Sequence, residues 1–590
     1  MLFGKYFFRF YIKYGLYFIA GILILVFVDW VQLEIPRLVG GIIDALGKDN
    51  PDVPVIRGDV WTIAMLAAGI TAGRFVWRYT IFGASRRIEA DIRNDMFVHA
   101  TKLPQQYYSH EKVGGLMAHF INDLEALRMA YGPGLLMLVD GLALGTLAVI
   151  RMAELNGTMT LYAGIPMLVL MIVMMFIMTK IRLKFKARQE AFESLSDFSQ
   201  EHFSGISVVK AYVREIKQGI LFQNRNEVLY DKNMGFVKYL VGINIAISVG
   251  LNLVIMLIIA YGSLLVLRTN QTELTAGQLT EYIAYFFTLI WPTMAIAQFM
   301  GIHSQAKASA SRIKVLLDQE PVVTDAPSVK HVEGLSGRIE AKGLTFQYPD
   351  GDAPVLDNVS FSIEKGEMVG ILGRTGSGKS SLVDLFLRIY NLEKDQVFID
   401  GHDIMDLPIK DVRQLMGYVP QDNFLFSETI RDNIGFAYDD TKDADVETPA
   451  RLADVHDNVM DFTHGYDTML GERGVTVSGG QKQRISIARA LAKDPEILIL
   501  DDSVSAVDTK TEEAIITNLH RVRKGKTTIF IAHRISTVKR MDKIILLEKG
   551  RLEAIGTHQE LMESSPLYAS MVKRQELENI VEGDDGHEGL

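Results

Sequence analysis

Six long apolar runs in the first 320 residues constrain the fold of this chain more than any other feature of its sequence. The runs cover Tyr14–Pro36, Val60–Ile81, Gly132–Met152, Thr158–Lys180, Val241–Leu267 and Leu279–Gly301. Each is close to the roughly 20 residues that a helix needs to cross the hydrocarbon core of a bilayer, so we predict six membrane spans. The link between the third and fourth runs is very short, which predicts a helical hairpin there.

The first run differs from a cleaved signal peptide. It follows Lys5, Arg9 and Lys13, which lie at helical spacing on one face of residues 1–14. However, it is too long, it carries Asp29 and Glu34, and it shows no cleavage site flanked by small residues. We therefore predict a retained span, preceded by a short helix that lies in the cytoplasmic interface.

The orientation of the spans follows from the distribution of Lys and Arg. These residues gather in two long links, Ile81–Tyr131 and Ile181–Leu240, and are sparse in the other loops. Positive charge stays on the cytoplasmic side, so the N-terminus and both long links are predicted to be cytoplasmic in a multi-pass protein of the cell membrane. Both links have few helix breakers, which predicts that the spans continue as helices beyond the bilayer.

The composition indicates two joined halves. The 590 residues are 48% hydrophobic and 22% charged, with a mean hydropathy of +0.15, which fits neither a wholly soluble protein nor a pure membrane protein. We predict a transmembrane domain over residues 1–319, a linker over 320–335, a soluble α/β domain over 336–577 and an acidic, disordered tail over 578–590. The soluble domain alternates short β-rich runs with helical stretches.

Charge and cysteine content exclude several function classes. The chain has no cysteine, which excludes disulfides, Cys-ligated zinc, iron–sulfur clusters and thiol catalysis. The formal net charge of −10 gives no support for nucleic-acid binding, which needs a basic surface.

A phosphate-binding motif opens the soluble domain. The segment from Gly373 to Ser380 matches GxxxxGK[ST], follows an apolar strand at Met368–Leu372 and precedes a helical run. In this motif backbone N–H groups surround phosphate oxygens, Lys379 reaches the β- and γ-phosphates, and Ser380 holds Mg²⁺. Asp501 ends a second apolar strand, so its carboxylate is expected to complete the Mg²⁺ shell.

These motifs, together with a later Val477-Ser478-Gly479-Gly480-Gln481 segment, resemble the ATPase domain of ABC transporters. Six spans followed by one such domain resemble an exporter-type half-transporter, which implies a helical membrane domain joined to a P-loop α/β ATPase that uses ATP and Mg²⁺. The resemblance extends to three further positions. Gln421 corresponds to a loop that senses Mg²⁺, and His533 corresponds to the switch histidine. Gly471–Gly474 resembles an exporter-specific segment. The resemblance implies that Tyr348 stacks on adenine and that Ser380, Gln421 and Asp501 bind Mg²⁺. The other residues implied to bind nucleotide are Gly373, Arg374, Thr375, Gly376, Ser377, Gly378, Lys379, Ser380, Ser381, Ser478, Gly479, Gly480, Gln481 and Asp508.

One position departs from the family pattern. Most active members have Glu directly after the strand-ending Asp, where it polarises the attacking water, but this chain has Asp502. A displacement of about 1 Å can cost on the order of 10²-fold in rate, so we predict that the chain's own site binds ATP but hydrolyses it poorly. The sequence thus resembles the degenerate half of a bacterial heterodimeric multidrug exporter, whose partner supplies the catalytic Glu.

The membrane half offers further candidates. Asn122–Leu127 and Gly205–Glu215 resemble the coupling helices at the tips of the two cytoplasmic links. Asp29 and Asp140 fall inside spans. They either face a cavity that attracts cationic amphiphiles, pair with a neighbouring helix, for instance through Arg74 or Arg78, or lie in the outer leaflet. Pro166 and Pro292 are predicted to kink their spans.

Other functions remain open at this stage. The sequence does not separate a drug exporter from a lipid flippase or a peptide exporter. A regulatory subunit that binds ATP without pumping is favoured slightly by Asp502 and disfavoured by the complete motif set. A membrane-anchored P-loop kinase is disfavoured by the Ser478–Gln481 segment and the six spans.

Overall fold

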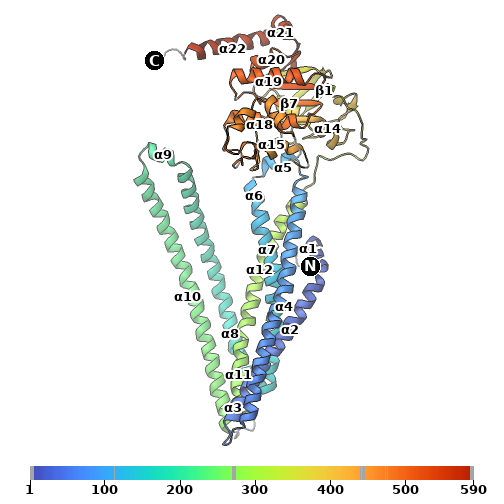
Figure 1. The fold of residues 1–590 in the computed structure, drawn as a ribbon. Coiled ribbons are helices and arrows are strands. Elements are labelled where there is room, and N and C mark those ends of the chain that lie inside the picture. The colour runs from blue at the N-terminus through green and yellow to red at the C-terminus, as the bar shows by residue number, and fades with distance from the viewer. Residues whose placement is uncertain are drawn as a thin grey trace. The chain divides into compact units, whose positions relative to one another are not determined.

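The structure is a computed structural model that describes residues 5–111, 113–268, 274–438, 440, 445–471, 474, 476–505 and 507–584. The chain divides into two units (Figure 1). One comprises Met1–Ala100 and Val113–Asp318, and the other comprises Thr101–Lys112 and Gln319–Leu590. The first is a helical membrane unit and the second an α/β unit.

The membrane unit consists of helices, several of them far longer than a bilayer is thick. Its elements are α1 (Lys5–Lys13), α2 (Gly15–Gln32), α3 (Glu34–Leu46), α4 (Val53–Ala100), α6 (Val113–Ala118), η1 (His119–Asp123), α7 (Leu124–Met129), η2 (Ala130–Gly134), α8 (Leu135–Ser204), α9 (Ile206–Ala211), α10 (Glu215–Arg268), α11 (Ala276–Thr288) and α12 (Ile290–Leu317). With 48 and 54 residues, α4 and α10 measure about 70 and 80 Å at 1.5 Å per residue. The predicted helical extensions beyond the bilayer are present.

Five helical segments among the described residues are long and apolar enough to cross a membrane, and one of them, Val113–Ser204, has 92 residues. This segment contains both the third and the fourth predicted spans. The backbone leaves helical geometry at Asn156, with φ −160° and ψ 105°. There the Asn156 side chain accepts a hydrogen bond from Met159 N at 2.9 Å and so caps the following helix.

Prolines explain where the first and last spans are interrupted. A proline ring clashes with the carbonyl group four residues earlier. Counting back from Pro36 gives Gln32, where α2 ends, and counting back from Pro292 gives Thr288, where α11 ends. The kink predicted at Pro292 therefore has a structural counterpart. Pro166 lies inside α8, and the kink predicted there stays a prediction.

The α/β unit contains two sheets. Its strands are β1 (Ile339–Phe346), β2 (Leu356–Ile363), β3 (Met368–Gly373), β4 (Val397–Ile399), β5 (His402–Asp403), β6 (Met416–Val419), β7 (Ile497–Asp501), β8 (Thr527–Ala532), β9 (Lys543–Glu548) and β10 (Arg551–Gly556). The larger sheet has the order β10-β9-β3-β8-β7-β6, and the smaller has β2-β1-β4-β5. Strand β3 lies between β8 and β9, is parallel to both, and is buried along its whole length.

Helices surround the sheets of this unit. They are α5 (Gln105–His110), α13 (Lys379–Phe386), α14 (Ile409–Leu415), α15 (Ile430–Ile434), η3 (Gly435–Ala437), α16 (Glu447–Leu452), α17 (His456–Met460), η4 (Gly465–Asp467), α18 (Gly479–Ala492), α19 (Thr509–Val522), α20 (Ile535–Val538), α21 (His558–Ser564) and α22 (Pro566–Asp584). Helix α22 continues to Asp584, into the stretch from residue 578 onward that the sequence predicts to be disordered.

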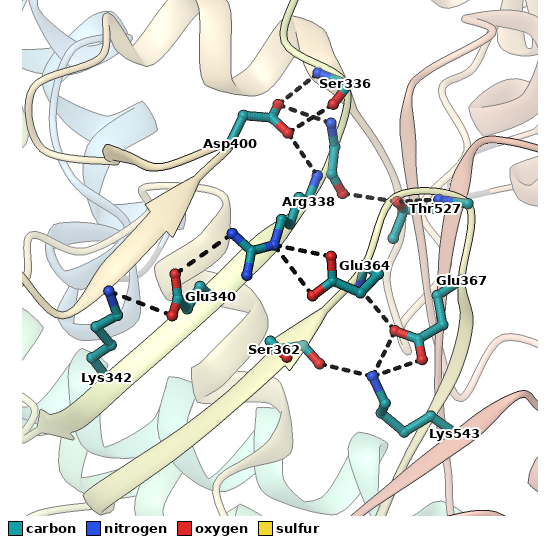
Figure 2. A network of polar contacts seen from close by, with 12 residues as sticks. Ser336, Arg338, Glu340, Lys342, Ser362, Glu364, Glu367, Asp400, Thr527 and Lys543 are labelled. Carbon is teal, nitrogen blue, oxygen red and sulfur yellow. Dashed lines mark hydrogen bonds and ion pairs between the residues drawn. The ribbon is translucent and has the colours of Figure 1, made fainter.

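A polar network fixes the start of the α/β domain (Figure 2). The Asp400 carboxylate accepts hydrogen bonds from the backbone N–H groups of Ser336, Gly337 and Arg338 at 2.6, 3.0 and 3.1 Å. The Thr527 hydroxyl donates to the Gly337 carbonyl at 2.8 Å. The chain that enters β1 is thereby joined to both sheets.

The tip of the first cytoplasmic link lies at a different place from the one predicted. Residues Thr101–Lys112, with α5, belong to the α/β unit, whereas Asn122–Leu127 lies within the membrane unit, in η1 and α7. The Asp350 carboxylate bonds Gln106 at 2.8 Å and His110 at 2.7 Å. In the second link, the short helix α9 lies within the predicted Gly205–Glu215 segment.

Candidate functional site: a nucleotide and magnesium site

The loop after β3 has the shape that a phosphate group needs. Gly376 and Gly378 adopt positive φ angles of +81° and +95°, a region that favours glycine. A Cβ atom on Gly378 would lie 2.7 Å from Leu356 Cδ2, whereas one on Gly376 would meet no atom within 4 Å. Gly378 is therefore required by packing, and α13 begins directly after it with its N-terminal N–H groups available to an anion.

Lys379 is held inside the loop. Its Nζ donates to the carbonyl groups of Gly373 at 2.8 Å and Arg374 at 3.0 Å. The residue is only 5% exposed, and burial lowers the pKa of Lys379. An ammonium group in this position gains from a polyphosphate, whose negative charge compensates the cost of its burial.

Ser380 and Asp501 form a donor set that fits Mg²⁺. Ser380 lies in the first turn of α13 and Asp501 ends β7. Burial raises the pKa of Asp501, and the nearby Ser380 side chain opposes that rise. Hydroxyl and carboxylate oxygens are the hard ligands that Mg²⁺ prefers, and this ion takes its remaining ligands from phosphates and water. In the described part of the chain no group of three or more acidic or histidine side chains could hold a metal ion on its own.

Tyr348 lies next to the phosphate loop. Its hydroxyl shares a 2.7 Å hydrogen bond with the hydroxyl of Ser381, on α13. Its ring packs edge-on against those of Phe346 and Tyr390, at centroid distances of 5.1 and 5.2 Å. The structure thus brings this sequence-predicted residue to the loop that would bind the phosphates.

Asp502 and His533 meet at the same end of the sheet. Asp502 follows β7 with φ +46°, its N–H donates to Ile531 O at 2.9 Å, and its carbonyl accepts from the Ser505 hydroxyl at 2.8 Å. Desolvation and the nearby Lys379 ammonium lower the pKa of His533, although Asp502 and the Gly373 backbone oppose this shift. At neutral pH this imidazole is uncharged and can accept or donate a proton.

The remaining predicted residues serve as helix caps or lie at the surface. The Ser478 hydroxyl accepts from Gln481 N at 3.3 Å and caps α18, and Asp508 accepts from Thr511 N at 3.0 Å and caps α19. Gln421 follows β6 and is exposed. In the described chain no hydrogen bond or ion pair connects these three residues to the phosphate loop. The Gly471–Gly474 segment lies partly outside the described residues.

One residue near the site was missed from the sequence. Asp384 lies on α13, and burial together with the charge of Asp501 raises the pKa of Asp384 to about 6. It stands four residues after Ser380, on the same helix face. The spacing of four residues from Ser380 is the feature of the sequence that points to Asp384.

Comparison with known proteins identifies the family. Residues 18–293 match the family model described as "ABC transporter transmembrane region", and residues 356–505 match the one described as "ABC transporter". The chain belongs to the ABC transporter family, and the order of its two domains is that of an exporter half-transporter. It is accordingly a multi-pass membrane protein with a cytoplasmic ATPase domain.

Individual relatives extend over almost the whole chain. The Escherichia coli (strain K12) "Multidrug resistance-like ATP-binding protein MdlA" is 35% identical over 95% of this chain and 94% of its own length. The Bacillus subtilis (strain 168) "Probable multidrug resistance ABC transporter ATP-binding/permease protein YheI" is 35% identical over 98% of both chains. A solved bacterial Atm1-family ABC exporter with ATP bound has a TM-score of 0.76 and 25% identity, and the match covers 94% of this chain and 98% of that one.

Proposed function

We propose that this chain is one half of a heterodimeric exporter that uses ATP to move amphipathic or hydrophobic compounds across the cytoplasmic membrane. The exporter role follows from the family. The names of the relatives from Escherichia coli and Bacillus subtilis, which refer to multidrug resistance, support this substrate class.

The heterodimer rests on Asp502. Its backbone is held on both sides, by the hydrogen bond from its own N–H to Ile531 O and by the bond that its carbonyl accepts from Ser505. The backbone therefore cannot advance toward the phosphates to compensate for a side chain that is one methylene group shorter than Glu. A base held roughly 1 Å too far from its water loses most of its effect, so this site would retain ATP and hydrolyse it slowly.

The Val477–Gln481 segment, here named the signature segment, supports a role in a second site. The reciprocal hydrogen bonds between Ser478 and Gln481 fix the first turn of α18, which directs helix N–H groups outward. Such a rigid helix terminus suits the nucleotide of a partner subunit. A chain with an impaired base and an ordered signature would contribute to hydrolysis in the partner's site more than in its own.

In this scheme ATP binding drives the transport step. Nucleotide can shift the membrane helices only by binding more tightly to the closed state of the paired ATPase domains than to the open state. Hydrolysis at the partner's site would then reset the pair, while ATP at the Asp502 site would keep the domains engaged.

The test is to purify the chain with whatever half-transporter accompanies it in the native host and to reconstitute the pair in inside-out vesicles. We expect ATP-dependent uptake of amphipathic compounds and a Glu at the position of Asp502 in the partner. Lys379→Ala serves as the control that removes nucleotide binding. A pair that binds ATP but transports none of a broad panel of compounds would instead support the regulatory-subunit hypothesis.

A further inference from the structure

The turn that carries His533 lies at the sheet edge where the phosphate loop begins. Strand β8 ends at Ala532, which pairs with Leu372 of the parallel strand β3, so His533 follows beside Gly373. On the other side of β8 lies the parallel strand β7, which ends at Asp501. Parallel strands end at the same edge of a sheet, so a shift of this turn moves the imidazole relative to the nucleotide site.

The helix that follows the turn takes its N-terminal cap from a distant part of the chain. Helix α20 covers only Ile535–Val538, and in the described chain the side chain of Arg534, at its N-cap position, forms no capping hydrogen bond. Instead, the N–H of Ile535 donates to Oε1 of Gln575, which lies on α22. The first N–H groups of a helix have no partner within the helix, and a side-chain acceptor stabilises its start. Gln575 therefore fixes the end of α20 that is nearest to His533.

Two other contacts hold the opposite end of α20. Val538 packs directly on β3, since a Cβ atom on Gly370 would lie 2.7 Å from Val538 Cβ. The Thr537 hydroxyl donates to the Glu512 carboxylate of α19, and both side chains are buried. With this end already fixed, the bond to Gln575 determines how the first residue of α20, and the turn before it, are placed.

Helix α22 holds Gln575 in a defined position. Tyr568, Val572 and Gln575 follow one another at intervals of four and three residues, which places them on one face of the helix. Tyr568 is fully buried, and it belongs with Val572 and Ile535 to the same hydrophobic cluster. The Tyr568 hydroxyl is hydrogen-bonded to His558 of α21 at 2.8 Å. Helix α22 thus packs against α20 and α21 (Figure 1).

We propose that Gln575 is a positioning residue for His533. By accepting the hydrogen bond from Ile535, it sets where α20 begins and holds the imidazole at the place that ATP hydrolysis requires. The C-terminal helix thereby contributes to the nucleotide site without touching the nucleotide. This inference goes beyond the proposed function, because it needs only slow ATP hydrolysis at the chain's own site and neither a partner nor a particular substrate.

The experiment is single-turnover hydrolysis of radiolabelled Mg-ATP by the full chain, with ATP affinity measured separately. One hydrogen bond typically shifts an equilibrium by roughly two- to tenfold, so Gln575→Ala should lower the hydrolysis rate about fivefold at unchanged ATP affinity. Gln575→Leu keeps the bulk of the side chain without an acceptor and should lower the rate similarly. Gln575→Glu keeps an accepting oxygen and should stay within about twofold of wild type.

Tyr568→Phe is the matched control. It removes a hydrogen bond from the same helix, the one to His558, and keeps the buried ring. Because Tyr568 does not bond α20, this variant should hydrolyse ATP at the wild-type rate. A loss as large as that of Gln575→Ala would show that the rate follows the general stability of α22, which would overturn the inference.

A double-mutant cycle separates positioning from a general structural effect. In a His533→Ala chain, Gln575→Ala should cause no further loss, because no imidazole remains to be positioned. Independent, multiplying losses from the two substitutions would overturn the inference, as would a wild-type rate in Gln575→Ala. A His533→Ala chain that hydrolyses ATP as fast as wild type would overturn it as well, while the proposed export function would stand.

Discussion

Restoring the missing methylene group at position 502 is the sharpest test of the impaired site. In Asp502→Glu the backbone stays fixed by its bonds to Ile531 and Ser505, so the longer side chain moves the carboxylate about 1 Å toward the phosphates. If that displacement accounts for the impairment, hydrolysis at this site should rise on the order of 10²-fold. In activation free energy this is about 2.7 kcal/mol.

The assay is single-turnover hydrolysis of Mg-ATP by the purified chain, with ATP binding measured separately. Asp502→Asn is the matched control: it should lower the rate only slightly if Asp502 contributes little as a base. Lys379→Ala should abolish both binding and hydrolysis. A hydrolysis rate for Asp502→Glu within twofold of wild type, at unchanged ATP affinity, would refute the argument. Side-chain length at position 502 would then not limit hydrolysis at this site.

Three further predictions concern other residues of the ATPase domain. In the assembled pair, His533→Ala should slow ATP hydrolysis without abolishing it, because the main site lies on the partner; complete loss in a steady-state ATPase assay would contradict this asymmetry. Tyr348→Ala should weaken ATP binding by about 1–3 kcal/mol through lost stacking, and Tyr348→Phe should not; equal effects in a fluorescent-nucleotide titration would point to the hydroxyl bond with Ser381 instead. Hydrogen bonds from Ser336 and its neighbours lower the pKa of Asp400 despite its partial burial, so Asp400→Asn should cost about 1–2 kcal/mol at pH 7. Because the folded-state pKa of Asp400 lies below the unfolded value, the stability difference between wild type and Asp400→Asn should shrink as the pH falls below about 4. A difference that stays constant with pH in thermal unfolding of the full chain would contradict this.

The nucleotide site could be predicted from sequence because its chemistry is local. A strand, a glycine-rich turn and a helix follow one another over about a dozen residues, and the turn's φ angles at Gly376 and Gly378 require glycine. The strand that ends in Asp501 was recognisable for the same reason. The role of Asp384 was not foreseen, although it stands one helical turn after Ser380.

The membrane domain was predictable in outline but not in detail. Span lengths follow from hydropathy alone, whereas the hydrogen bond from Trp291 to Asp140 depends on how two helices rotate against each other. The tip of the first cytoplasmic link was misplaced at Asn122–Leu127 because that polar segment resembled a known pattern. The signal for the true tip was present in Pro104 and the Gly114–Gly115 pair, which flank α5.

The measurement that tests the central claim most directly is the steady-state ATPase rate of the chain reconstituted alone, compared with the rate of the chain paired with its Glu-bearing partner. The account predicts little turnover alone, although ATP is bound, and brisk turnover that amphipathic substrates stimulate in the pair. Brisk turnover by the chain alone would contradict the heterodimer and the impaired site at Asp502 together.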